Sequence, residues 1–298
     1  MNTNRCLVTG GAGFLGSRLV KTLLSKNSDI SIKVIARNES EITNLMTTCS
    51  NDNRIHLIVG DIRNKHSMNY ALQDVDTVFH LAAMKHIDLC ELNPSEAIST
   101  NVIATNNLLN MFKGNTFIGI STDKAVEPKS CYGATKLLLE KLTMEKAWIN
   151  PKSRRYIIVR SGNVFGSAGS VIPKWINQIK QYNKITITDL RIARFFIRVE
   201  ALVSSIINIK ERGESGKIYI PKQSIIRLGD LARAVIEVYG NKDTVTEITG
   251  LGNSEKLYER IFLKTEKNIV TTNSCETSDE QAGIISVEEI KLWLRNQS

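Results

Sequence analysis

The sequence predicts an α/β protein, a Rossmann-type doubly wound parallel sheet followed by a smaller C-terminal α+β lobe. Three observations lead to this fold. Short apolar runs alternate with stretches of helical spacing over the first 160 residues. A glycine-rich turn, Gly10–Gly16, joins the first apolar run to the first helical stretch. After about residue 162 the alternation ends. Strands that alternate with helices form a parallel sheet covered on both faces.

The expected elements follow from hydrophobic periodicity. Six runs read as buried strands: Cys6–Thr9, Ile32–Ala36, Ile55–Val59, Thr77–Ala82, Thr116–Ser121 and Tyr156–Arg160. Helical spacing is clearest in three stretches: Phe14–Ser25, Ala97–Phe112 and Ala134–Trp148. We therefore expect residues 1–162 to form a dinucleotide-binding domain, because this alternation is typical of one.

The second half mixes shorter strands and helices. Expected strands are Ile185–Thr188, Phe195–Ile197, Lys217–Ile220 and Val245–Ile248, and expected helices are Glu200–Lys210, Arg227–Tyr239, Ser254–Phe262 and a short one from Pro173. Thr271–Gly283 is polar and is expected to be a loop, and Ser286-Val287-Glu288-Glu289 has the pattern of a capping box that opens a last helix. Residues 163–298 are thus expected to form mainly a substrate-binding lobe, with some parts returning to the first domain.

Composition narrows the class of protein. The chain has 298 residues, 42% of them hydrophobic, and a formal net charge of +9. The basic residues are dispersed without an aromatic-rich stripe, so we expect an anionic cofactor and substrate rather than nucleic acid. No apolar run is long enough to cross a membrane and no signal-peptide pattern opens the chain, which predicts a cytoplasmic location. The five cysteines are scattered and the four histidines lack zinc spacing, so no metal site is expected.

The glycine motif predicts the cofactor site. In Gly10-Gly11-Ala12-Gly13-Phe14-Leu15-Gly16, Gly10 permits a tight turn, Gly13 admits a pyrophosphate close to the backbone, and Gly16 allows close helix–strand packing. Phe14 and Leu15 open the helix whose N-terminal N–H groups face the phosphates. A glycine-rich turn without a ligand is the alternative, which the preceding strand and following helix disfavour.

The end of the second strand indicates which dinucleotide binds. A carboxylate there would bind the ribose 2′-hydroxyl of NAD, but this strand ends Ile35-Ala36-Arg37-Asn38. Arg37 is suited to a 2′-phosphate, so NADP is expected in preference to NAD. A solvated loop arginine is the alternative, since Glu39 and Glu41 lie nearby.

The residues from Thr122 to Lys136 carry the predicted chemistry. Tyr132 and Lys136 are four residues apart on an expected helix and therefore share a face. A neighbouring ammonium lowers the pKa of a phenol and makes it a usable base. Asp123-Lys124 adds an acid and an amine, which simple dehydrogenases do not need. A turn with a surface ion pair is the alternative reading of this pair.

With these motifs in place, the chain resembles the extended short-chain dehydrogenase/reductases, and more narrowly the inverting UDP-N-acetylglucosamine 4,6-dehydratases of pseudaminic acid and related polysaccharide pathways. The resemblance covers nearly the whole chain. It rests on Gly60-Asp61-Ile62-Arg63, His80 to His86, Asn93-Pro94, Ser121 to Ala125, Tyr132 to Lys136, Gly162 to Ser167, Gly169 to Pro173, Arg194-Phe195-Phe196 and the Ser-Val-Glu-Glu helix. Retaining dehydratases of this kind carry Thr-Asp-Glu where this chain has Thr122-Asp123-Lys124, so Lys124 indicates the inverting subclass.

The resemblance implies the following roles. Tyr132, with Lys136 and Thr122, would take the proton of the sugar 4-hydroxyl as NADP accepts hydride. Lys124 would remove the C5 proton and Asp123 would protonate the departing 6-hydroxyl. Further members of the cofactor site would be Asp61, Ile62, Ala82, Ala83 and Lys85. The UDP-sugar would be met by Lys85, Asn163, Val171, Arg194 and Glu255.

Two positions depart from the pattern. Relatives usually carry Arg-Pro-Gly before Glu-Lys-Leu, whereas here Gly252-Asn253-Ser254 precede Glu255. Ala168 also stands where relatives often have arginine. Two expected anion contacts are therefore missing, so the sequence predicts the reaction more firmly than the sugar nucleotide.

Three other readings stay open: a nucleotide-sugar epimerase, a 5,6-dehydratase of the same fold, and an NADP-sensing regulator without chemistry. Family members assemble as dimers or hexamers, and by that analogy a homo-oligomer is expected.

Overall fold

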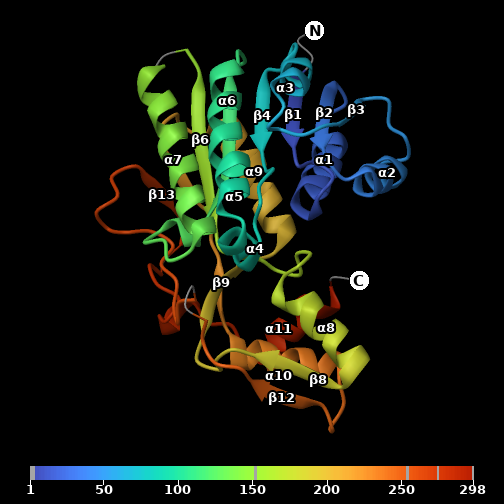
Figure 1. Ribbon diagram of the computed structural model, residues 1–298, viewed down its shortest axis with the longest axis vertical. Helices are drawn as coiled ribbons and strands as arrows, with labels where there is room; N and C mark the ends of the chain where they lie inside the picture. The colour runs from blue at the N-terminus through green and yellow to red at the C-terminus, as the bar shows by residue number, and fades with distance from the viewer. Residues whose placement is uncertain (1–3, 151–152, 253–254, 274, 297–298) are drawn as a thin grey trace.

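The computed structural model describes residues 4–150, 153–252, 255–273 and 275–296. An eight-stranded parallel sheet with helices on both faces forms the larger part (Figure 1). Its strand order is β13-β10-β6-β5-β4-β1-β2-β3. The strands are β1 (Asn4–Thr9), β2 (Ile30–Ala36), β3 (Ile55–Val59), β4 (Thr77–His80), β5 (Thr116–Thr122), β6 (Arg155–Ser161), β10 (Ile218–Ile220) and β13 (Ile269–Thr271). This confirms the predicted Rossmann-type fold.

Successive residues of the central strands enter two different cores, as a doubly covered sheet requires. On one face Val8 and Val34 pack with α1 (Phe14–Lys26), α2 (Glu39–Thr48) and α9 (Val199–Arg212). On the other face Leu7 and Ile35 pack with α3 (Lys65–Leu72), α6 (Ala104–Met111) and α7 (Cys131–Ile149). Both faces are mainly apolar, apart from the buried ion pair between Arg160 of β6 and Glu140 of α7. We therefore look for a ligand site at the ends of the strands.

The smaller lobe lies below the sheet in Figure 1 and has its own core around Trp175. Its strands are β7 (Asn163–Val164), β9 (Ala193–Ile197) and β11 (Ser224–Arg227) in one sheet, and β8 (Lys184–Ile187) with β12 (Val245–Ile248) in another. Its helices are α8 (Val171–Tyr182), α10 (Leu228–Tyr239) and α11 (Val287–Arg295). The Ser286 side chain accepts a hydrogen bond from Glu289 N, which is the bond expected of the capping residue before α11.

The chain crosses between the two parts more than once. After β9 it returns to the large sheet as α9, which packs against α1, and then as β10 and β13. The sheet edge beside β6 is thus built from residues far along the sequence.

The predicted helix Ala97–Phe112 is interrupted. The structure has α4 (Ile87–Leu92) and α5 (Pro94–Ile98), then a π-helical turn at Ser99–Ile103, then α6. Asn101, fully buried in that turn, explains the interruption: its amide binds Met84 N and O at 2.8 Å and Thr135 Oγ1 at 3.0 Å. The loop after β4 is thereby fastened to α7.

The predicted helix Ser254–Phe262 is wrong over its described residues, 255–262. The backbone of this stretch bonds to other segments instead of to itself. Leu257 O accepts from Ala193 N, Glu259 N donates to Ser278 Oγ, and Ile261 N donates to Glu276 O. Long-range pairing has overridden helical periodicity here.

Among the helices that the structure describes, none is long and apolar enough to span a bilayer.

Candidate active site

The glycine turn between β1 and α1 is shaped to approach a ligand closely. Gly10 has φ +68°, and a Cβ on Gly16 would stand 2.3 Å from Gly10 O. Gly13 is the N-cap of α1 and offers no side-chain hydrogen bond to the first turn, which also lacks acidic residues. The N-terminal N–H groups of α1 are therefore available to an anion such as a pyrophosphate. Phe14 and Leu15 lie partly buried against the sheet core.

The end of β2 presents an exposed cation. The Arg37 side chain is 61% exposed, and its Nη1 lies 3.9 Å from Asp61 Oδ2. Asp61 is held far more closely by Arg63, whose Nη2 lies 2.7 Å from the same oxygen. Burial raises the Asp61 pKa, but the hydrogen bonds from Arg63 outweigh it and the pKa is lowered. Among the residues that the structure describes, Arg37 has a long ion pair with Asp61 and no closer partner, while Ile62 is buried in the core.

The loop after β4 is anchored by a histidine that the sequence analysis did not single out. His80 is buried, with Nδ1 2.8 Å from Thr9 Oγ1 and Nε2 2.9 Å from Thr105 Oγ1. Thr9 Oγ1 also accepts from Ala82 N at 3.2 Å. Ala82 and Ala83 therefore sit beside the glycine turn, where a Cβ on Gly10 would lie 3.0 Å from Ala82. Thr9 and His80 are polar residues at the carboxyl ends of two adjacent parallel strands, β1 and β4. This pattern in the sequence could have predicted the contact.

Lys85 reaches across to the smaller lobe. Its Nζ donates to Ala168 O at 2.9 Å. The loop that precedes α8 is thereby tied to the loop that follows β4, although Ala168 lacks the side chain that relatives often have there.

The turn after β5 gathers the predicted acid and amine. Thr122 Oγ1 donates to Asp123 Oδ1 at 2.8 Å, and Lys124 Nζ donates to the same oxygen at 3.0 Å. The Asp123 side chain is fully buried and that of Lys124 is 15% exposed. Lys124 Nζ also lies 3.4 Å from Asn163 Oδ1, so the turn contacts the start of the smaller lobe.

Helix α7 brings Tyr132 and Lys136 to the same place. Ser130 caps the helix by accepting from Gly133 N, and a Cβ on Gly133 would stand 2.3 Å from Lys124 O. The first turn of α7 therefore lies directly against the Asp123-Lys124 turn. Lys136 is buried and donates to Ile120 O at 2.8 Å.

Burial is the largest cause of the pKa shifts of both Tyr132 and Lys136 on α7. It lowers the Lys136 pKa to about 8. Burial also raises the Tyr132 pKa, and the negative charge of Asp123 raises it further. A cationic group beside the phenol is required before Tyr132 can act as a base near neutral pH.

The predicted substrate residues fall into two groups. Asn163 lies beside Lys124 and donates to Phe195 O at 3.1 Å. Val171 opens α8 and packs partly against the core of the smaller lobe. Arg194 and Glu255 instead hold the backbone. The Arg194 guanidinium donates to Ala193 O, Lys256 O and Leu257 O, and Glu255 Oε2 accepts from Gly252 N at 3.3 Å.

A second buried carboxyl, Glu259, was missed by sequence analysis because the predicted helix 254–262 did not place it in the site. It is 4% exposed, and the charges that act on it include Asp123, Lys124, Arg194 and Lys256. Its only sequence signal is its place four residues after Glu255 in Glu-Lys-Leu-Tyr-Glu.

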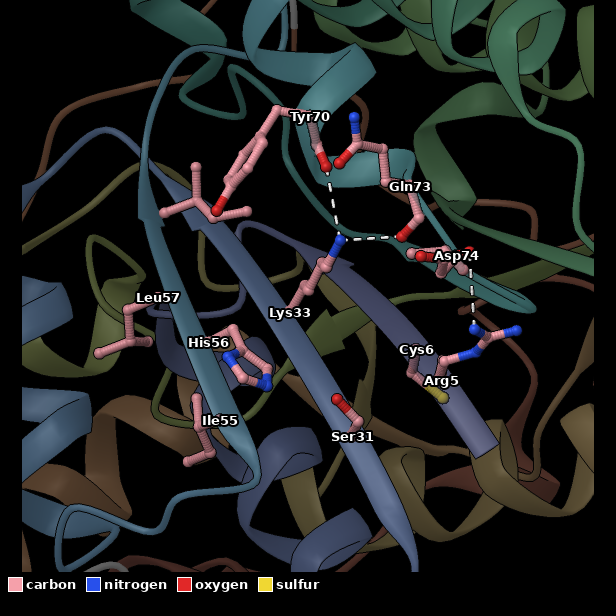
Figure 2. A pocket seen from close by; sticks show the side chains of 12 residues that line it. Arg5, Cys6, Ser31, Lys33, Ile55, His56, Leu57, Tyr70, Gln73 and Asp74 are labelled. Carbon is pink, nitrogen blue, oxygen red and sulfur yellow. Dashed lines mark hydrogen bonds and ion pairs between the residues drawn. The ribbon is translucent and has the colours of Figure 1, made fainter. Parts of the chain in front are cut away.

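A cavity of about 530 Å³ lies elsewhere, at the amino-terminal ends of β1, β2 and β3 (Figure 2). Lys33 crosses it and donates to Tyr70 O and Gln73 O at the C-terminus of α3. None of the predicted site residues lines this cavity. Since ligands of open α/β sheets bind at the carboxyl ends of the strands, we place the candidate active site at Gly10, Thr122 and Tyr132.

Comparison with known proteins agrees with this fold. The chain is 40% identical over 270 residues to a Methanocaldococcus jannaschii protein described as an uncharacterised membrane protein, covering 87% of this chain and 80% of that one. It is 36% identical over 262 residues to the UDP-glucose 4-epimerase of Rickettsia prowazekii, covering 86% and 76%.

Solved structures share the fold of this chain. Pen from Bacillus thuringiensis superposes with a TM-score of 0.89 at 32% identity and 99% coverage of both chains. DesIV, a dTDP-glucose 4,6-dehydratase from Streptomyces venezuelae solved with NAD and TYD, has a TM-score of 0.76 at 22% identity, with 84% and 85% covered. This second likeness shows the fold alone. The family model described as polysaccharide biosynthesis protein matches residues 6–278, and the chain belongs to that family.

Proposed function

We propose that this chain is an NADP-dependent nucleotide-sugar 4,6-dehydratase that acts on UDP-N-acetylglucosamine and inverts C5. One observation carries the proposal: an acid–amine pair, Asp123 and Lys124, lies against the first turn of the helix that bears Tyr132. An enzyme that only moves hydride needs the phenol, whereas an elimination also needs a base for carbon and an acid for the leaving hydroxyl.

Two features of the glycine turn fit a dinucleotide. Gly13, the N-cap of α1, makes no side-chain hydrogen bond to the first turn, so the N–H groups there can bind a phosphate. A Cβ on Gly10 or Gly16 would clash with neighbouring backbone atoms, so the turn can be this tight only with glycine at both positions. Gly10, Gly13, Phe14, Leu15 and Gly16 would hold the pyrophosphate, with Asp61, Ile62, Ala82 and Ala83 around the rest of the cofactor. A bound nicotinamide would accept the C4 hydride and later return it to C6. Its positive charge would also favour the Tyr132 phenolate, which burial alone disfavours.

The protein's own groups would perform the remaining steps. Tyr132 takes the proton of the sugar 4-hydroxyl, while Thr122 and Lys136 orient the phenol. The resulting ketone acidifies the C5 proton, which Lys124 removes. Asp123 gives a proton to the 6-hydroxyl, which departs as water. C5 is then protonated from the face opposite Lys124, which inverts its configuration. Lys85, Asn163, Val171, Arg194 and Glu255 would line the sugar nucleotide.

The experiment is incubation with a panel of nucleotide sugars, UDP-N-acetylglucosamine included, in deuterated water. We expect a product lighter by one water, with a 4-keto-6-deoxy sugar, deuterium at C5 and inverted configuration, read by mass spectrometry and NMR. Retained configuration at C5 would contradict the role of Lys124, and product from another sugar nucleotide alone would contradict the substrate.

An epimerase is the second candidate, because the Rickettsia relatives are named UDP-glucose 4-epimerase. The same incubation separates it, since an epimerase gives an isomer of unchanged mass. A 5,6-dehydratase would lose water but keep an alkene between C5 and C6.

A regulator without chemistry predicts no turnover of any substrate, and its biological effect would survive Tyr132→Phe. The proposed enzyme would lose its effect with that substitution.

The choice of NADP rests on Arg37. Neighbouring structures such as DesIV hold NAD, so the test is direct titration with both cofactors. We expect NADP to bind more tightly, and Arg37→Gln to weaken NADP roughly tenfold, about 1.4 kcal/mol, while NAD is unaffected. Tighter binding of NAD by the unaltered protein would overturn the preference.

We also propose that the protein is a homo-oligomer, a dimer or a hexamer, by analogy with its family. Light scattering that finds a monomer would exclude this.

A further inference from the structure

The turn that carries Asp123 and Lys124 ends in a strained backbone. Val126 N donates to Asp123 O at 3.0 Å and closes the turn. The next residue, Glu127, has φ +48°, a left-handed conformation that residues other than glycine rarely adopt. A backbone of this kind persists only where the surrounding contacts enforce it. The contacts at Val126 and Glu127 therefore decide where this turn lies.

Two basic side chains of the 255–262 segment contact the end of the turn. Lys256 Nζ donates to Val126 O at 2.9 Å. Arg260 Nε lies 3.4 Å from Glu127 Oε2, but these two side chains are 44% and 58% exposed, so their ion pair contributes little. The Lys256 side chain is 13% exposed, and a bond from a buried ammonium is stronger. Lys256 is thus the main restraint that this segment places on the turn.

Lys256 is itself held by the smaller lobe. Its Nζ forms an ion pair with Glu259 Oε2 at 3.4 Å, and the Glu259 side chain is 5% exposed. Its backbone O accepts from Arg194 Nη2 at 2.6 Å, and Leu257 O accepts from Arg194 Nη1 at 3.0 Å. Since Arg194 belongs to β9, the position of the Lys256 ammonium is set by residues of the smaller lobe.

The larger domain fixes the other parts of the turn. Thr122 pairs with Ser161 in the ladder between β5 and β6. The first turn of α7 lies against Lys124, where a Cβ on Gly133 would stand 2.3 Å from Lys124 O. The acid–amine turn is therefore held from both parts of the molecule, whereas Tyr132 is carried by α7.

We propose that Lys256 is a positioning residue for the elimination, because its bond to Val126 O keeps Asp123 and Lys124 in the geometry that removes the C5 proton and releases the 6-hydroxyl. This inference rests on the proposed dehydration. Misplacing reacting groups by about 1 Å slows a reaction severely. Oxidation at C4 depends instead on Tyr132. Loss of the Lys256 ammonium should therefore slow the elimination more than the oxidation that precedes it.

The first test needs no substrate. Hydrogen exchange of the full chain is followed by mass spectrometry in Lys256→Met, which keeps much of the side-chain length but removes the donor. Lys33→Met is the matched control, since Lys33 also donates to backbone carbonyls, Tyr70 O and Gln73 O, at the amino-terminal ends of the strands. We expect faster exchange at residues 123–127 in Lys256→Met and no change there in the control. Unchanged exchange at 123–127 in Lys256→Met would overturn the inference.

The second test is turnover of the nucleotide sugar that the unaltered protein dehydrates. We expect Lys256→Met to lower kcat about tenfold with KM nearly unchanged, while Lys33→Met matches the unaltered protein. In a single turnover, reduced nicotinamide should accumulate in Lys256→Met, because oxidation at C4 outruns the elimination. Lys256→Arg, which keeps a donor, should restore part of kcat. A raised KM with unchanged kcat would overturn the inference, because it would mean that Lys256 binds the substrate instead.

Thermal unfolding checks that the variants fold. Lys256→Met leaves the buried Glu259 carboxyl without its ammonium, which is destabilising. If this variant unfolds, the double variant Lys256→Met with Glu259→Gln takes its place in both tests, with the same expected results.

The outcomes separate the two proposals. If the unaltered protein dehydrates nucleotide sugars and Lys256→Met does so at the same rate, the inference is wrong and the proposed function stands. If the unaltered protein dehydrates none, the proposed function is wrong, and the role of Lys256 in elimination is wrong with it.

Discussion

The two sides of the proposed site, one for the cofactor and one for the substrate, are built differently. On the cofactor side, Gly10, Thr122 and Tyr132 belong to short sequence motifs that lie just after β1, at the end of β5 and in the first turn of α7. On the substrate side, Arg194 and Glu259 are positioned by backbone bonds between β9, the 255–262 segment and Ser278. The comparison teaches that residues within short motifs can be identified from local sequence, whereas residues positioned by pairings remote in the chain cannot.

The largest expected effect tests the cofactor side. Tyr132→Phe removes the phenolic oxygen that we propose takes the 4-hydroxyl proton, and turnover should fall by about 10²- to 10⁴-fold. The fold should be unaffected, because the ring remains in its place on α7. Steady-state kinetics and thermal unfolding measure the two. Turnover within threefold of the unaltered protein would mean that this motif does not carry the chemistry.

The next largest effect is the loss of folding stability in acid, and it depends on His80, which anchors the loop beside the glycine turn. Burial, with the charge of Lys136, lowers the His80 pKa to about 3 from an ordinary value of 6.5. The unfolded chain binds this proton below about pH 6.5 while the folded chain refuses it, so stability falls as pH falls, by about 1.4 kcal/mol per unit. Denaturant unfolding between pH 7 and pH 5 measures the slope. His80→Asn should flatten it, and an equal slope in both proteins would contradict the explanation.

A smaller effect comes from the glycine turn. In Gly16→Ala the new Cβ would meet Gly10 O at 2.3 Å, so the turn must shift, at a cost of about 2 kcal/mol. Cofactor binding should weaken in parallel. Gly252→Ala is the matched control, since the nearest atom to its Cβ is 4.0 Å away. Equal stability of the two variants would show that the turn adapts.

The smallest effect tests the substrate side. Arg194→Met keeps much of the side-chain length but removes the guanidinium donor of three backbone carbonyls. Ala193 O keeps its bond from Ser278 Oγ and Leu257 O its bond from Ala193 N, so Lys256 O is the most affected. We expect a loss of about 1 kcal/mol and faster hydrogen exchange in residues 255–262, with cofactor affinity unchanged. If cofactor affinity fell as well, the substrate side would affect the cofactor side, and the two could not be treated as separate.

Sequence patterns predicted much of the fold and the motifs of one side of the site. The alternation of strands and helices was enough to predict the sheet, since the central strands are largely apolar and buried. It missed the interruption at Asn101, because the cause is a side-chain bond to Met84 and Thr135. It missed Glu259 for a related reason. The periodicity of 254–262 is helical, but the backbone found partners on β9 and at residues 276–278.

The return of the chain to the large sheet has a consequence for biosynthesis. β6 pairs with β10, and β10 pairs with β13, which ends at Thr271. During translation the strand edge of β6 therefore stays open until Ile218–Ile220 has been made, more than fifty residues after Ser161, although every strand on its other side is complete. An open edge of apolar parallel strand invites pairing with other chains. Nascent chains that stall within the smaller lobe should be the forms of this protein that depend most on chaperones.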